Sequence, residues 1–200
     1  MRVGRTHLLF CALTLLLVSV SPARADLEAG KRALEHQDYA AALKELKPLA
    51  EQGNAEAQAL LGEMYSLGRG VPLDVNQAQK WYQAAADQGN ARGQCSLGSM
   101  DLKRDTAQGL RLLKLSAQQG DADAYLILGM AYMNLKEAPR DVVQADMWLR
   151  LAAGRGDGLA SGQRPKLESQ MTRDQIAQAE ALAAAWNPKV TAGPGAEKKN

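Results

Sequence analysis

The stretch AEQGNAEAQALLG at residues 50–62 decides how this chain is organised, because it returns twice with few changes. The copies read ADQGNARGQCSLG at residues 86–98 and AQQGDADAYLILG at residues 117–129, and a fainter fourth copy, AGRGDGLA, occupies residues 153–160. The glycine at the fourth position of each copy recurs after 36, 31 and 36 residues. That period is typical of helix-turn-helix repeats stacked into a solenoid.

Each copy carries residues that end one helix and begin the next. The fourth-position glycine suits the left-handed conformation at a helix C-terminus, and the Asn or Asp after it suits the N-cap of the following helix. These turn glycines are Gly53, Gly89, Gly120 and Gly156. A second glycine follows nine residues later, in mid-helix, where it costs about 1 kcal/mol relative to alanine. We therefore expect Gly62, Gly98 and Gly129 to mark close contacts between two helices.

The sequence predicts an all-α protein, an α/α solenoid of stacked helix-turn-helix repeats with a C-terminal capping helix. The capping box TRDQ at residues 172–175 starts that last helix, and the hairpin before it has lost the repeated Leu-Gly pair. The predicted solenoid covers residues 26–186, with repeats at about 26–53, 54–89, 90–120 and 121–156, a cap at 157–186 and a disordered tail at 187–200.

Residues 1–25 have the pattern of a secretory signal peptide cleaved after Ala25. Arg2 and Arg5 precede an apolar run from Leu8 to Val20, and small residues stand before the cut. The run is too short to span a bilayer comfortably. We therefore expect a periplasmic or secreted protein with no stable membrane insertion after cleavage.

The composition of the mature chain narrows the possible functions. Cleavage removes three arginines and no acid, which leaves 21 basic and 22 acidic side chains without a basic cluster for nucleic acid. Cys95 and His36 are its only cysteine and histidine, so an intrachain disulfide is excluded and a histidine-rich zinc site or a Ser-His-Asp triad is hard to build. We expect no catalytic residue, no metal and no cofactor.

LGEMYSLGRGVPLD at residues 61–74, followed by AQKWYQAAADQG at residues 78–89, is similar to the Sel1-like repeat family, which is related to tetratricopeptide repeats. The resemblance implies α/α hairpins in a right-handed superhelix, and most members of that family act as scaffolds or adaptors for protein assembly. This chain departs from the pattern in its short third unit, where Leu112 stands in the place of Trp81 and Trp148.

Several conspicuous side chains are most simply explained by packing. Trp81 and Trp148 share one register in their hairpins, which favours a structural role over ligand stacking. Cys95 aligns with Ala59 and Leu126, which favours a buried thiol. The acidic pairs Asp121 with Asp123 and Glu51 with Glu56 are interpreted as helix-start charges that complement the helix dipole.

Our leading hypothesis is an exported, non-enzymatic repeat protein that acts as a scaffold or adaptor in the cell envelope. It would bind a protein or peptide partner on a concave surface lined by the first helix of each hairpin. Candidate partner-binding residues are the variable, exposed positions Glu63, Arg69, Arg92, Ser99 and Asp101. Two alternatives stay open: an envelope enzyme acting on peptidoglycan or β-lactam-like substrates, and a polysaccharide-binding component of an export complex.

Overall fold

The computed structural model describes residues 25–134 and 141–188. The described residues form ten α-helices and no strand. The helices are α1 (Leu27–Glu35), α2 (Tyr39–Glu51), α3 (Ala55–Leu67), α4 (Val75–Asp87), α5 (Ala91–Asp101), α6 (Thr106–Gln118), α7 (Ala122–Asn134), α8 (Val142–Gly154), α9 (Gly158–Glu168) and α10 (Arg173–Ala185). The predicted signal peptide before Ala25 and the predicted tail after Pro188 lie outside the described residues.

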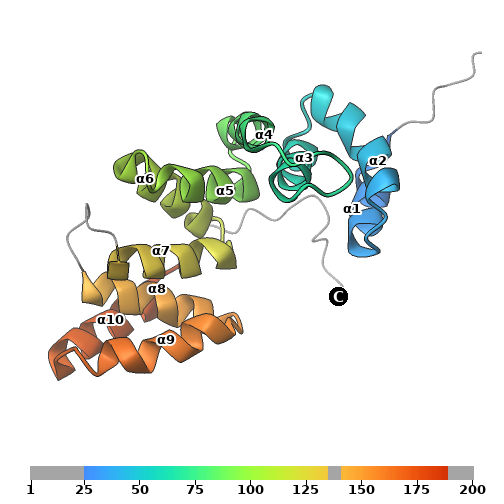
Figure 1. The fold of residues 1–200 in the computed structure, drawn as a ribbon. Helices are drawn as coiled ribbons and strands as arrows, with labels where there is room; N and C mark the ends of the chain where they lie inside the picture. Colours follow the sequence, from blue (N-terminus) through green and yellow to red (C-terminus); the bar gives the residue numbers. More distant parts are fainter. Residues whose placement is uncertain (1–24, 135–140, 189–200) are drawn as a thin grey trace, which may run out of the picture.

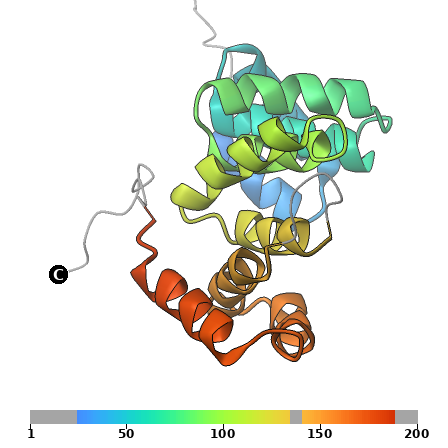
Figure 2. The same cartoon turned by 90° about the vertical axis from the view of Figure 1, so that its left-hand side faces the viewer.

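Consecutive helices pair as hairpins, and the hairpins stack side by side in an arc (Figure 1). The turned view shows the same succession, from α1 and α2 at one end to α9 and α10 at the other (Figure 2). In Figure 1, α3 and α5 lie on the inner side of the arc, whereas α4 and α6 lie on its outer side. The prediction of an all-α solenoid of stacked helix-turn-helix repeats is confirmed.

The turns between repeats share one geometry. Gly53 and Gly120 have φ values of 90° and 87°, a left-handed conformation that L side chains rarely adopt. The next residue then caps the following helix. Asn54 Oδ1 accepts a hydrogen bond from the Ala57 amide at 2.9 Å, and Asp157 Oδ1 accepts one from the Ala160 amide at 2.7 Å. Glycine and cap therefore reverse the chain at the same point in each unit.

The mid-helix glycines lie where two helices touch. A Cβ atom on Gly62 would lie 2.7 Å from the Tyr82 ring, and one on Gly129 would lie 2.8 Å from Leu149 Cδ2. In the third hairpin Gly98 faces Gly109, and a Cβ on Gly98 would lie 3.0 Å from the Gly109 carbonyl oxygen. The two helices of each hairpin are thus close enough to exclude even a methyl group.

Glutamine side chains join the two helices of a hairpin and also reach the preceding hairpin. Gln58 and Gln94 are buried on α3 and α5. Gln88 Nε2 donates to Gln58 Oε1 at 2.7 Å, and Gln119 Nε2 donates to Gln94 Oε1 at 2.9 Å. Gln58 Nε2 also donates to the Ala50 carbonyl oxygen at 3.1 Å, and Gln119 Nε2 donates to the Gly89 carbonyl oxygen at 2.9 Å. Because these two bonds cross to the preceding hairpin, the stacking register of the hairpins is fixed by hydrogen bonds as well as by apolar packing.

The C-terminal cap is more regular than the sequence predicts. Residues 158–168 form the helix α9 although they lack the Leu-Gly pair of the earlier copies, and Pro165 lies inside it. The fully buried side chain of Leu167 packs into the same core cluster as Trp148. Tertiary packing therefore stabilises a helix that the repeat pattern does not indicate.

A buried ion-pair network ties the last three helices together. Asp146 on α8 is fully buried, and its carboxylate lies 2.7 Å from Arg150 Nε. Arg150 also contacts Glu168 on α9 at 2.8 Å and Glu180 on α10 at 3.0 Å, and Arg164 contacts Glu168 at 2.8 Å. A buried charge of this kind is tolerated only because it is paired and hydrogen-bonded.

Replacing Gly98 by leucine is expected to lower the free energy of unfolding by about 1–3 kcal/mol, because the backbone of α6 leaves no room for a side chain. Gly162→Leu is the matched control: Gly162 is also inside a helix, but a Cβ there would meet nothing within 4 Å. Urea denaturation followed by circular dichroism measures both variants. Equal stability of the two would contradict close contact between α5 and α6.

Asp146→Ala is expected to cost about 3–5 kcal/mol, because it leaves the Arg150 guanidinium without its buried partner. Glu180→Ala removes another carboxylate from the same guanidinium, but the Glu180 side chain is 66% exposed, so we expect a loss below about 1 kcal/mol. Differential scanning calorimetry of the two variants gives the comparison. A network without structural importance would show similar, small losses for both.

Candidate partner-binding surface

The inner side of the arc contains a hollow of about 450 Å³ between α3, α4, α5 and α7. Its wall is mostly apolar, with hydroxyl groups interspersed. The lining residues are Ser66, Val75, Ala78, Tyr82, Cys95, Ser96, Ser99, Met100, Asp123, Leu126 and Ile127. Because these come from three successive hairpins, the hollow exists only in the stacked array.

Tyr82 connects the packing of the helices to the chemistry of the hollow. The bare backbone of Gly62 makes room for the Tyr82 ring on the neighbouring helix. The Tyr82 hydroxyl then lies 3.2 Å from Ser66 Oγ at the wall of the hollow. Burial raises the pKa of the Tyr82 hydroxyl, so the group keeps its proton and serves as a hydrogen-bond donor as well as an acceptor.

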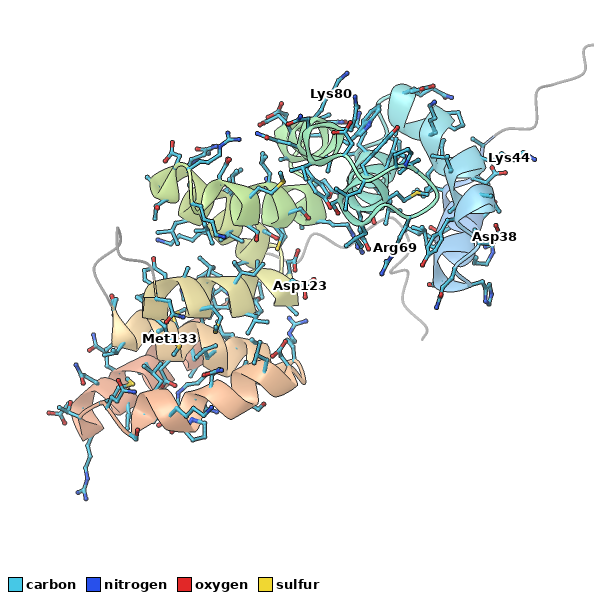
Figure 3. The ribbon with its side chains drawn as sticks, viewed as in Figure 1. Asp38, Lys44, Arg69, Lys80, Asp123 and Met133 are labelled. Atoms are coloured by element: carbon cyan, nitrogen blue, oxygen red, sulfur yellow. The ribbon has the colours of Figure 1, made fainter. Side chains whose placement is uncertain are left out.

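Three of the predicted partner-binding residues meet in one ion-pair cluster. Glu63 on α3 lies between two guanidinium groups, 3.5 Å from Arg69 Nη1 and 3.0 Å from Arg92 Nη1. The Arg69 guanidinium also stands over the Tyr39 ring, 5.8 Å from its centroid. Figure 3 shows Arg69 on the inner side of the arc and Lys80 on the outer side. This cluster joins the predicted repeat at residues 54–89, which contains Glu63 and Arg69, to the repeat at residues 90–120, which contains Arg92.

The other two predicted residues differ from each other. Ser99 is exposed and lines the hollow. Asp101 is buried, with 8% of its surface exposed, so the expectation that it is an exposed position is wrong. The reason is that Asp101 ends α5: its carbonyl oxygen accepts hydrogen bonds from the Arg104 and Asp105 amides, and its side chain pairs with Arg104 at 3.6 Å.

Asp123 is a residue of the hollow that the sequence analysis missed. It stands three residues after its turn glycine, the register that Glu56 and Arg92 occupy in the two preceding units. The sequence analysis interpreted Asp121 and Asp123 together as helix-start charges. The structure separates them, because Asp121 caps α7 through the Asp123 amide at 3.0 Å, whereas the Asp123 side chain is exposed and lines the hollow. The register that Asp123 shares with Arg92 is the feature of the sequence that indicates Asp123 as a candidate surface residue.

Glu51 and Glu56 were likewise interpreted as a pair at a helix start. Glu51 is in fact the last residue of α2, and only Glu56 lies in the first turn of a helix. The Glu56 carboxylate accepts a hydrogen bond from Asn90 Nδ2 at 2.8 Å, across the boundary between two repeats. Its interaction is therefore with the next unit as well as with its own helix dipole.

The conspicuous aromatic and sulfur side chains lie in packed positions. Trp148 is buried in the C-terminal core, and Trp81 is half-buried against the N-terminal core cluster. Cys95 is buried in the wall of the hollow. Burial raises the pKa of the Cys95 thiol, and the nearby carboxylates of Asp121 and Asp123 raise it further. The thiol is therefore protonated and forms part of an apolar wall.

The described residues contain no group of three or more His, Cys, Asp or Glu side chains placed to hold a metal ion. None of the helices in residues 25–134 and 141–188 has both the length and the apolarity needed to cross a membrane.

Stacked helical hairpins with a lined inner hollow define a class of protein, the α/α repeat solenoids whose curved face is their contact surface. A sequence profile described as Sel1 repeat matches residues 55–90, 92–121 and 122–157. The chain belongs to the Sel1 repeat family.

Named relatives share this repeat architecture over part of their length. The alginate biosynthesis protein AlgK of Pseudomonas putida is 31% identical over 165 residues, which are 78% of this chain and 34% of AlgK. A protective antigen of uropathogenic Escherichia coli strains, which displays an SLR fold, matches with a TM-score of 0.65 and 30% identity over 79% of this chain and 37% of the antigen. A Sel1 repeat protein from Oxalobacter formigenes matches with a TM-score of 0.63 and 25% identity over 80% of this chain and 70% of its own.

This chain therefore spans only about a third of AlgK and of the E. coli antigen. The shared part is the repeat array, so the likeness concerns the fold. Activities and partners of the longer proteins do not follow from it.

In a protein lacking residues 1–25, Cys95 is the only cysteine and is expected to be unreactive toward Ellman's reagent at pH 8 in the folded state, because its pKa is raised. It should react fully in denaturant. The same shift predicts that stability declines as pH rises above the ordinary thiol pKa of 9.0, since the unfolded chain then loses a proton that the folded chain keeps. The absorbance of the thiolate released from Ellman's reagent measures the labelling, and rapid labelling of the folded protein would contradict the first statement. Urea denaturation at neutral and alkaline pH measures the stability, and an equal loss of stability in the control Cys95→Ala would contradict the second.

Proposed function

We propose that this Sel1 repeat protein is an exported, non-enzymatic adaptor of the cell envelope that binds a protein or peptide partner on its inner surface. The observation that carries the proposal is the hollow of about 450 Å³ to which three successive hairpins contribute. It combines apolar side chains with hydroxyl groups, the mixture found in protein contact surfaces. Its lining residue Asp123 lies on the inner side of the arc (Figure 3).

The case for a protein partner rests on how the exposed side chains are distributed over several repeats. Exposed Ser99 and Asp123 lie in the hollow, and the exposed Arg69 and Arg92 flank it through their pairing with Glu63. A curved face of this kind offers many shallow contacts over several repeats instead of one deep pocket. Such a surface suits an extended segment or a helix of another protein better than a small molecule.

Export is proposed from the first 25 residues, whose charge and apolar pattern is that of a signal peptide.

The absence of an enzyme activity is proposed from the positions of the cysteine and the histidine, the side chains best suited to nucleophilic or acid-base catalysis. The Cys95 thiol is buried and protonated, while His36 is exposed at the C-terminus of α1, so the two are on different helices and His36 is not among the residues that line the hollow.

A second candidate is a role in the biosynthesis of an exported polysaccharide, favoured by the 31% identity to an alginate biosynthesis protein. The hollow argues against direct binding of an anionic glycan such as alginate. Its charged lining residue is Asp123, whose carboxylate has no ion-pair partner among the described residues and would repel a polyanion. In such a pathway the chain would thus act by holding a protein component.

Ser99→Trp is expected to abolish partner capture, because Ser99 is exposed in the hollow and an indole there fills the space a partner needs. Lys80→Trp is the matched control, since Lys80 is exposed on the outer face of α4 (Figure 3). The measurement is affinity capture by residues 26–200 from a cross-linked envelope extract, analysed by mass spectrometry. The proposal predicts a stoichiometric protein that the parent and Lys80→Trp recover and Ser99→Trp loses.

Capture that survives Ser99→Trp would contradict the proposed surface. Recovery of glycan fragments without protein would favour the second candidate, which titration of the purified protein with alginate oligosaccharides then tests. A double reversal, Arg69→Glu with Arg92→Glu, examines whether the ion-pair cluster around Glu63 contributes to the same contact.

A further inference from the structure

The hollow on the inner surface is apolar on most of its wall and has one charged side chain among its described lining residues. Val75, Met100, Leu126 and Ile127 supply the large apolar groups. Asp123 supplies the charge, from the first turn of α7. It also lines a neighbouring polar hollow at the turns between repeats, so it stands where the apolar wall meets a polar edge.

The other carboxylates nearby already have partners. Glu56 accepts a hydrogen bond from Asn90 and lies 4.0 Å from Arg92 Nε. Glu63 pairs with Arg69 and Arg92, and Asp121 accepts a hydrogen bond from Ser116 Oγ at 2.9 Å while it caps α7. The exposed Asp123 carboxylate has no hydrogen bond and no ion pair within residues 25–134 and 141–188. Its charge is therefore available to a group outside the described chain.

Three large apolar side chains of α3, α4 and the loop between them are exposed, and one of them lines the hollow. Val75 lines the hollow and has 54% of its surface exposed. Leu67, directly after the lining residue Ser66, is 50% exposed, and Leu73 in the α3–α4 loop is 64% exposed. Val75 therefore adds an uncovered apolar group to the wall of the hollow, as contact surfaces do.

We propose that this hollow recognises a partner segment in which a Lys or Arg side chain lies close to a large aliphatic or aromatic side chain. The inference rests on the proposed protein-binding function and names the chemistry of the partner. The apolar side chain would pack against Met100, Leu126 and Ile127, and the cation would pair with Asp123. The Tyr82 and Ser66 hydroxyls at the wall would bind the segment's backbone.

Charge decides between this occupant and others. An acidic peptide would bring a second negative charge to the unpaired Asp123 carboxylate, and no described lining residue of the hollow supplies a compensating cation. The same argument disfavours the headgroup of an anionic lipid and a uronic acid chain. A neutral apolar segment would cover Asp123 without compensating the loss of its hydration.

The test is selection of a phage-displayed library of random dodecapeptides on residues 26–200, followed by fluorescence anisotropy with the enriched peptides. We expect the enriched sequences to share a Lys or Arg near a large apolar residue. Asp123→Lys should weaken their binding by about tenfold or more, and replacing the peptide's basic residue by Glu should restore binding to that variant. Asp123→Asn should reduce the dependence of affinity on salt concentration.

Asp174→Lys is the matched control, because Asp174 is also an exposed acid in the first turn of a helix, on α10 at the far end of the arc. It should bind the peptides as the parent does. Enriched peptides without basic residues, or equal effects of the Asp123 and Asp174 variants, would overturn the recognition of a cation and leave the adaptor function intact. If Ser99→Trp does not block the binding of any enriched peptide, the inference is overturned. If partner capture from the envelope extract also survives Ser99→Trp, the proposed function is overturned as well.

Discussion

The structure depends on a steric constraint: the two helices of a hairpin approach until no side chain fits between them. Gly62, Gly98 and Gly129 provide that approach in successive units. The distance it sets determines where the next residues lie, because the Tyr82 ring packs on Gly62 and brings its hydroxyl to the inner hollow. A packing requirement inside one hairpin thus fixes a hydrogen-bonding group on the contact surface.

Polar contacts between hairpins have a different task. The Gln58–Ala50, Gln119–Gly89 and Glu56–Asn90 hydrogen bonds align one repeat with the next, and the Glu63 cluster joins the edges of two units on the inner side. Most charges on this side are therefore used within the protein. The exposed Asp123 carboxylate differs from them, and with the apolar wall beside it defines the chemistry of the surface.

The repeat pattern made the fold predictable, because each local signal agreed with the global architecture. The turn glycines, the caps and the capping box at Thr172 could be identified from residue types alone. Helix α9 could not, since burial of Leu167 and the Asp146 network stabilise it through distant contacts. The burial of Asp101 was missed for a similar reason, because variability between copies does not report exposure. Asp123 was missed because a helix-start acid has a sufficient local explanation, and only the stacking of α7 beside α5 places it in the hollow.

The Asp146 network also makes the two ends of the array different. At the C-terminal end α8 contacts both α9 and α10, and Arg150 contacts carboxylates on all three helices. At the other end α1 is joined to the array mainly through α2. In a solenoid each unit is stabilised chiefly by its neighbours, so local opening is easiest where neighbours are fewest. We therefore expect the amide hydrogens of α1 to exchange sooner than those of α8, so that local opening of the described array begins at its N-terminal hairpin.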